Sequence, residues 1–198
     1  GVGEISRAWN CALEVFVRET NPGLSGIGGL TAFSHVLTES NTTHKSVPML
    51  LSPVSASSFD SIYYQKGIIT AFKEAGYQTA FFSNQRYNHS FIDFFGKEAD
   101  TYDFIKEDVG DSNYNPSDNE LLKLVAKELG KGVSRQFIVL HTYGSHFNYK
   151  ERYPAEQAFF LPDMTVAAVV KSKDNQINAY DNSLRYPDNY PIRPIAMH

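Results

Sequence analysis

The amino-acid sequence predicts an α/β fold built on a mainly parallel β-sheet. Strand-like and helix-like segments alternate along the chain, which is the order found in β-α-β units. The continuous apolar run within Gln136–His141 is typical of a strand buried on both faces. The 198 residues, of which 42% are hydrophobic, are enough to form one domain with a sizeable core.

The first part of the chain predicts two strands, a turn-rich connection and a helix. Gly1–Glu4 is typical of the end of a strand, and residues 20–29 are rich in Pro and Gly, which favours turns. Thr31–Leu37 has the length of a short strand. Thr42–Leu51 follows a polar stretch suited to the start of a helix, although Pro48 lies too deep for a long regular one.

The middle of the chain predicts a helix, a strand and a loop. Apolar residues recur at helical spacing over Ile62–Ala75, and Gly76 is a residue type that commonly follows the end of a helix. Tyr77–Phe82 then has the composition of a strand. Residues 108–119 are rich in Asp, Asn, Ser and Gly, which predicts an exposed loop.

The last part predicts two helices around the buried strand and an irregular tail. Ser117 and Glu120 have the spacing of a capping box, which would open a helix over Leu121–Leu129. Ala179–Leu184 also predicts a helix. Closely spaced prolines disfavour its continuation, so we expect an irregular tail over residues 187–198.

Composition excludes several classes of function. A formal net charge of −4 provides no polycation for nucleic acid or anionic lipid. No apolar run approaches the ~18 residues of a membrane-spanning helix. The single cysteine, Cys11, excludes an internal disulfide and a multi-cysteine metal site. We expect a monomer.

Polar residues at the predicted strand ends are the candidate functional residues, because ligands of open parallel sheets bind there. Glu4 ends the first strand, Asn84 follows a central strand, and His146 follows the buried strand. Thr43 opens a predicted helix, where unpaired backbone N–H groups favour an anion. Structural interpretations stay open: Glu4 could pair with Arg7, Thr43 could be only an N-cap, and His146 could be an ordinary loop residue. As metal ligands, Glu4 and His146 form an incomplete set.

Five short motifs occur in the order seen in one enzyme family. They are Glu4-Ile-Ser-Arg7, Arg18-Glu-Thr-Asn-Pro22, Ser40-Asn-Thr-Thr-His-Lys-Ser-Val-Pro48, Leu140-His-Thr-Tyr-Gly-Ser-His146 and Tyr180-Asp-Asn-Ser-Leu184. Through them the chain resembles the catalytic domain of the phosphoethanolamine transferases, the lipid A modifying enzymes that include the colistin-resistance type. That family is part of the sulfatase-like branch of the alkaline phosphatase superfamily. The resemblance implies a three-layer α/β/α fold.

The resemblance also implies the chemistry. Thr43 matches the nucleophile that carries phosphoethanolamine, and Glu4 matches a carboxylate ligand of zinc. His146 matches a histidine on the side of the substrate and a second metal, where it would bind that metal or protonate a leaving oxygen. One or two zinc ions would thus contact Glu4, Thr43 and His146.

Substrates and location follow from the same resemblance. Asn84 and Gln85 fall where the family places polar contacts to the phosphoryl group or ethanolamine. His44 is adjacent to Thr43, so its side chain would face either the substrate or solvent. The donor would be phosphatidylethanolamine, and the acceptor a hydroxyl of lipid A or another glycan. The domain would work on the periplasmic side of the inner membrane, held there by membrane segments outside this chain.

Departures from the family pattern indicate a partial catalytic domain. Glu39 and Met49 stand where many members have cysteines, and Ile5 replaces the usual Thr or Ser after the zinc-binding Glu. The Asp-His-Gly metal motif of the family does not occur, since no Asp is followed by His anywhere in the sequence. Residues 1–198 therefore resemble the amino-terminal part of the domain, with its carboxy-terminal portion and several zinc ligands missing.

Three other functions were weighed against this one. A phosphoglycerol transferase of the lipoteichoic acid synthase kind, or another sulfatase-like phosphodiesterase or hydrolase, is the nearest enzymatic alternative. A fragment that at most binds metal or phosphate is the non-enzymatic one. A formylglycine sulfatase is disfavoured, because Ser46-Val-Pro48 is followed by Met49 and Leu50, without the required Arg.

Overall fold

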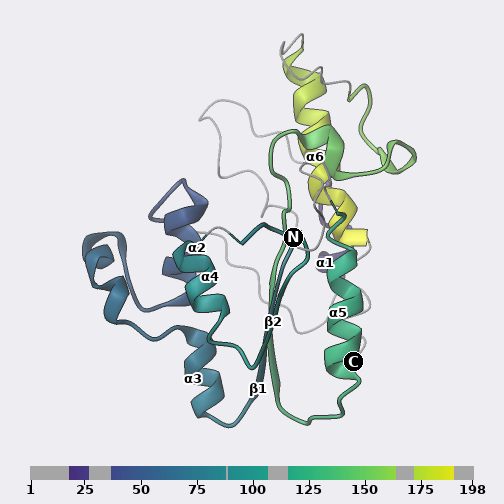
Figure 1. The fold of residues 1–198 in the computed structure, drawn as a ribbon. Helices are drawn as coiled ribbons and strands as arrows, with labels where there is room; N and C mark the ends of the chain where they lie inside the picture. Colours follow the sequence, from purple (N-terminus) through teal and green to yellow (C-terminus); the bar gives the residue numbers. More distant parts are fainter. Residues whose placement is uncertain (1–17, 27–36, 88, 107–115, 164–171, 190–198) are drawn as a thin grey trace. The chain divides into compact units, whose positions relative to one another are not determined.

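A computed structural model describes residues 18–26, 37–87, 89–106, 116–163 and 172–189 (Figure 1). The chain divides into two compact units. The first combines residues 1–36 and 144–198, and the second is the continuous segment 37–143. The predicted strand over Gly1–Glu4, Cys11, and all of the predicted strand Thr31–Leu37 except Leu37 lie outside the described residues. Among the described residues, no helix combines the length and apolar character needed to cross a bilayer.

The second unit contains a parallel sheet. Its strands are β1 (Gln78–Ser83), β2 (Thr101–Phe104) and β3 (Gln136–His141). Strand β1 lies between the other two, with Phe81 opposite Tyr102 of β2 and Val139 of β3. The predicted α/β class, the parallel sheet and the two predicted strands at β1 and β3 are therefore confirmed.

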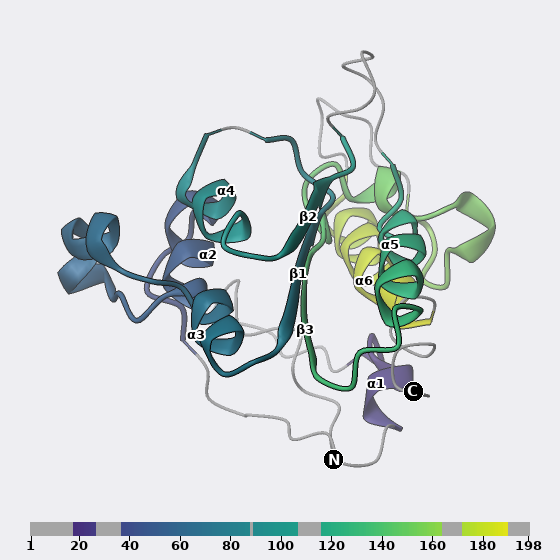
Figure 2. The ribbon, with the colours of Figure 1, turned by 60° about the horizontal axis from the view of Figure 1, so that its bottom comes forward.

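Helices cover both faces of this sheet (Figure 2). They are α2 (Thr43–Leu51), α3 (Ile68–Glu74), α4 (Phe91–Gly96) and α5 (Glu120–Leu129). Phe81 packs in one core with residues of α2, α3 and α4. Ala80 and Phe82 pack in a second core with Leu121 and Val125 of α5. Because successive side chains of a strand point to opposite faces, the apolar run of β1 serves both cores, which gives the predicted three layers.

Helix α2 occurs where the sequence predicts it. Its N-cap is Thr42, whose carbonyl accepts hydrogen bonds from the N–H groups of Lys45 and Ser46. Pro48 lies inside the helix and removes one backbone donor. The helix persists through Pro48 because both that residue and Leu51 are buried in the core.

The single helix predicted over Ile62–Ala75 is wrong, because the segment is broken in two. A 3₁₀ helix, η1, spans Ala56–Tyr64, and α3 begins only after Gly67. The Glu98 carboxylate, from a distant part of the chain, accepts hydrogen bonds from the N–H groups of Gly67 (2.7 Å) and Thr70 (3.1 Å). This carboxylate satisfies the unpaired donors of a new helix start, which helical periodicity cannot predict.

The sequence did not predict two elements of this unit, helix α4 and strand β2. Helix α4 opens with a capping box, in which Ser90 Oγ accepts from the Ile92 N–H and Asp93 Oδ2 accepts from the Ser90 N–H, each at 3.2 Å. Strand β2 then follows along the other edge of β1. Both elements are short, so their patterns are weak.

The predicted helix over Leu121–Leu129 is confirmed as α5, but its predicted capping box is wrong. The N-cap is Asn119, and Ser117 Oγ accepts from the Asn119 N–H instead of the Glu120 N–H. Strand β3 is also less buried than predicted, since every one of its residues is half-buried. Among the described residues β3 pairs only with β1, which leaves its other edge partly exposed.

The first unit is built around α6 (Lys173–Asn189) and the short helices α1 (Pro22–Ser25), η2 (Tyr149–Arg152) and η3 (Ala155–Gln157). The predicted helix over Ala179–Leu184 is thus confirmed but too short, and the irregular tail predicted from residue 187 is wrong as far as residue 189. Pro187 lies inside α6, and the last turn is held because the Asp188 carboxylate accepts from the Gly23 N–H at 2.5 Å. Residues 190–198 lie outside the described part.

We predict that Gly67→Ala lowers the free energy of unfolding by about 1–3 kcal/mol. An added Cβ would lie 2.6 Å from Glu98 Oε2, 2.7 Å from Phe95 Cδ1 and 2.9 Å from the Leu51 carbonyl oxygen. Urea denaturation measures the change. The neighbouring exposed Lys66→Ala variant is the control and should change it by less than about 0.5 kcal/mol. Equal effects of the two substitutions would contradict the steric argument.

Candidate active site at the carboxyl edge of the sheet

Thr43 is the first residue of α2, and its side chain is exposed. Its interpretation as an N-cap is wrong, because Thr42 occupies that position. Among the described residues, neither the Thr43 hydroxyl nor the N–H groups of Thr43 and His44 make a hydrogen bond. The first turn also contains no acidic residue. This helix start therefore presents a hydroxyl and N–H donors in a setting that favours an anion.

The end of β1 is tied to the segment before α5 by the buried side chain of Asn84. Its Nδ2 donates to the Pro116 carbonyl at 2.9 Å and to Asp118 Oδ1 at 2.7 Å. The same Asp118 oxygen accepts from the Tyr143 N–H at 2.8 Å, just beyond β3. Asp118 therefore joins the carboxyl ends of β1 and β3 to the start of α5.

The Asn84 amide oxygen is buried and has no hydrogen-bond partner within the described parts of the chain. The Asn84 nitrogen is committed to Pro116 and Asp118. Asn84 can therefore offer a ligand only its Oδ1 atom, which is an acceptor. An acceptor suits an N–H or ammonium group better than a phosphoryl oxygen.

Gln85, the next predicted residue, is held by Ser83 and His141. Ser83 Oγ accepts from the Gln85 N–H at 3.1 Å and lies 3.0 Å from His141 Nδ1. Burial lowers the pKa of His141 below its ordinary value, although the charges of Asp93 and Asp118 oppose this. His141 is therefore neutral near pH 7.

Lys106, beyond the end of β2, adds a cation to this edge. Its side chain is only 8% exposed, and Nζ lies 3.6 Å from the centre of the Tyr143 ring. Polar residues thus follow all three strand ends, and the residues missed from sequence are Ser83, Lys106, Asp118 and His141. A complete list of strand ends would have pointed to Ser83, Lys106 and His141, but β2 was not predicted and His141 has no ligand-like spacing in the sequence. Asp118 lies at no strand end.

The predicted residues of the second unit form two pairs, and the two members of each pair are adjacent in the sequence. Thr43 and His44 share the first turn of α2. Asn84 and Gln85 directly follow β1. No hydrogen bond between described residues links one pair to the other.

The remaining predicted residues belong to the first unit. His146 is exposed, and its Nδ1 lies 2.7 Å from the Phe147 carbonyl oxygen. Glu4 lies outside the described residues. Within the described ranges, no group of three or more His, Cys, Asp or Glu side chains could hold a metal ion. Because zinc in proteins takes about four ligands, the described residues alone do not fit a zinc ion.

We predict that Asp118→Ala lowers the free energy of unfolding by about 2–4 kcal/mol, because the donors of Asn84 and Tyr143 lose their shared acceptor. Chemical denaturation measures the loss. Asp60→Ala removes an exposed carboxylate of the same unit and should leave stability nearly unchanged. If both variants behaved alike, Asp118 would not organise this edge.

The lowered pKa of His141 predicts a pH-dependent stability. Below the unfolded-state pKa of about 6.5, the unfolded chain binds a proton that the folded chain takes up only at lower pH. The stabilising contribution is therefore complete above that pKa and is lost as the pH falls through the window below it. Denaturation between pH 5 and about 8 should show a shallower decline for His141→Gln than for His44→Gln. Identical declines would contradict the prediction.

Comparison with known proteins agrees with this architecture. The chain is 29% identical to the phosphatidylethanolamine transferase Mcr-1 of Escherichia coli, over 98% of this chain and 38% of that protein. It is 25% identical to the phosphoethanolamine transferase EptC of Escherichia coli strain K12, over 94% of this chain and 34% of that protein. The crystal structure of the C-terminal periplasmic domain of E. coli EptC in complex with Zn has a TM-score of 0.74 at 24% identity, covering 87% of this chain and 50% of that chain.

The chain thus spans about a third of the length of these curated relatives. Their names confirm the resemblance to phosphoethanolamine transferases, and the crystal structure confirms the fold. The sequence model of the Sulfatase family matches residues 2–190, nearly the whole chain. The chain is accordingly a member of the Sulfatase family.

Proposed function

We propose that this chain is part of a phosphoethanolamine transferase in which Thr43 carries the transferred group. The observation that carries the proposal is the exposed Thr43 hydroxyl at the start of α2, beside N–H groups that no described residue uses. The names of Mcr-1 and EptC support the reaction. We propose phosphatidylethanolamine as the donor and a hydroxyl of lipid A or another glycan as the acceptor.

The reaction would proceed in two displacements at phosphorus. In the first, Thr43 Oγ1 forms a bond to phosphorus, the bond from phosphorus to the glycerol oxygen breaks, and diacylglycerol leaves with the proton lost by Thr43. In the second, the acceptor hydroxyl attacks phosphorus, the bond to Thr43 breaks, and Thr43 regains a proton. The free N–H groups at the start of α2 would bind the negative phosphoryl oxygens in both steps.

Neighbouring residues would recognise the rest of the donor. His44 shares the helix start with Thr43, and the Asn84 amide oxygen is a buried acceptor suited to the ammonium of ethanolamine. Gln85 would contact the same headgroup from the turn that Ser83 holds. His146 would protonate the leaving oxygen or bind a second metal.

We further propose that the complete enzyme is zinc-dependent and works on the periplasmic face of a membrane. Glu4, Thr43 and His146 would contribute ligands, and the remainder would come from outside the described residues. Zinc, when bound, would favour deprotonation of a threonine hydroxyl. The support is that the structure of the EptC domain is a periplasmic domain in complex with Zn.

Intact-protein mass spectrometry after incubation with phosphatidylethanolamine and zinc tests the nucleophile. We expect a phosphoethanolamine adduct on the unmodified chain and on Thr42→Ala, and none on Thr43→Ala. Thr42 is the matched control, because it is the adjacent threonine and its side chain makes no capping hydrogen bond. An adduct that persists in Thr43→Ala would refute the assignment.

The same experiment distinguishes the other functions. An adduct formed only from phosphatidylglycerol would indicate a phosphoglycerol transferase instead. If the chain forms no adduct from either lipid and retains no zinc after dialysis, the proposal fails for these 198 residues. Release of ethanolamine phosphate without an acceptor would indicate a hydrolase.

A further inference from the structure

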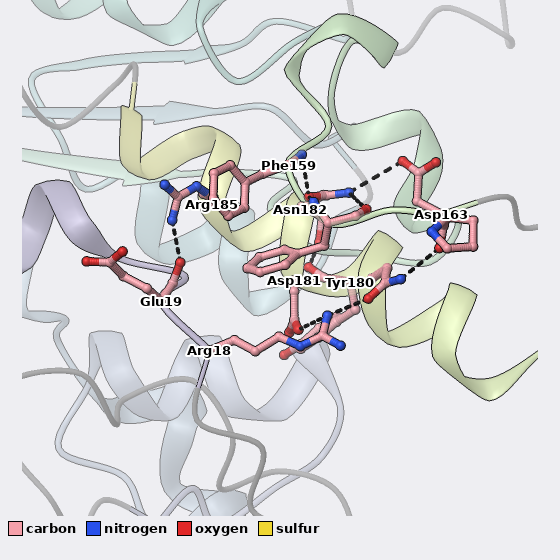
Figure 3. Close-up of polar contacts among 12 residues, drawn as sticks. Arg18, Glu19, Phe159, Asp163, Tyr180, Asp181, Asn182 and Arg185 are labelled. Carbon is pink, nitrogen blue, oxygen red and sulfur yellow. Dashed lines mark hydrogen bonds and ion pairs between the residues drawn. The ribbon is translucent and has the colours of Figure 1, made fainter.

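One buried side chain of α6 holds the backbone of an exposed loop. Asn182 Oδ1 accepts hydrogen bonds from the N–H groups of Phe159 (2.9 Å) and Phe160 (2.8 Å). Asn182 Nδ2 donates to the Phe160 carbonyl at 2.9 Å (Figure 3). These three backbone groups, two N–H groups and one carbonyl, are therefore satisfied from within the protein and do not need water.

The same loop carries three exposed apolar side chains beside the half-buried Phe160. Phe159 is 62% exposed and Leu161 is 67% exposed, and Pro162 is exposed beside them. We call Phe159–Pro162 the apolar loop. Single exposed apolar residues are common, but a consecutive set on a turn held in one conformation indicates a binding surface.

Two arginines lie against the rings of the apolar loop (Figure 3). The guanidinium carbon of Arg185 lies 4.0 Å from the centre of the Phe159 ring, and that of Arg18 lies 5.0 Å from the centre of the Phe160 ring. The Arg18 charge is compensated by Asp181 at 3.3 Å. Arg185 donates to the Glu19 carbonyl and forms no ion pair with any carboxylate of the described residues.

The acidic group beneath the apolar loop is compensated as well. Asp163 is buried, with Oδ2 2.5 Å from Lys150 Nζ and 2.7 Å from the Tyr153 hydroxyl. Burial and the hydrogen bond to Asp163 raise the pKa of Tyr153, so Tyr153 stays a neutral donor. Asp163 is thus paired, whereas Arg185 is in an ion pair with no carboxylate of the described ranges.

We propose that the apolar loop inserts into the headgroup region of an anionic lipid bilayer, with Arg185 on the lipid phosphates. Aromatic and aliphatic side chains partition into that region, and anionic lipids attract an adjacent arginine. The Asn182 hydrogen bonds lower the cost of desolvating the backbone of Phe159 and Phe160. They also set the loop conformation before binding, so little entropy is lost on insertion.

Co-sedimentation of the full 198-residue chain with phosphatidylethanolamine–phosphatidylglycerol vesicles tests the surface. The unmodified chain should bind, and the double variant Phe159→Ser/Leu161→Ser should bind at least about tenfold more weakly. Tyr64→Ser is the matched control, because Tyr64 is 88% exposed in the other unit and should not contribute. Arg185→Gln should reduce the loss of binding on addition of salt.

A second measurement reports insertion directly. With vesicles, Phe159→Trp should show a blue-shifted tryptophan emission that brominated acyl chains quench. Tyr64→Trp should show neither the shift nor the quenching. Trp9 contributes the same background emission in both variants. Absence of vesicle binding, or unchanged binding of the double variant, would overturn the proposal. A molecular mass above that of one chain, measured by light scattering, would also overturn the proposal, because the loop would then be a contact between copies of the chain. The test does not depend on transfer, so it can fail while Thr43 still forms its adduct.

Discussion

One oxygen atom of Asp118 holds together the edge of the sheet where the chemistry is expected. It accepts the side-chain amide of Asn84, after β1, and the backbone N–H of Tyr143, after β3. The strands themselves pair only as far as Ser83 and His141. Beyond those ends, the Asp118 carboxylate and the Pro116 carbonyl of the same segment hold the Asn84 side chain.

The fold was predictable where a pattern is local and long. The apolar runs of β1 and β3 and the amphipathic stretch of α5 each contain their own signal, so these elements were found at nearly the right residues. The break at Gly67 was not predictable, because the carboxylate that causes it lies 31 positions away at Glu98. Strand β2 has only four residues, too few for alternation to stand out.

The candidate site divides in the same way. Thr43 and Asn84 were predicted because a helix start and a strand end are positions that a sequence pattern can locate. Gln85 came only from a family resemblance, and His44 only from its place beside Thr43. The importance of Asp118 arises from hydrogen bonds across 25 and 34 positions, so no local pattern contains it. Likewise, Pro187 suggests the end of a helix until the contact of Asp188 with Gly23 is known.

The pairing of Arg18 with α6 has a consequence for the order in which the chain can fold. Arg18 hydrogen-bonds Asn178, 160 positions further on, and forms an ion pair with Asp181. During synthesis on a ribosome, the second unit emerges complete before either partner of Arg18 exists. The closure of so long a loop is entropically unfavourable, but the prior folding of residues 37–143 shortens the effective loop. Folding of the second unit therefore favours the later contact of Arg18 with α6, and a defect within that unit would delay this contact.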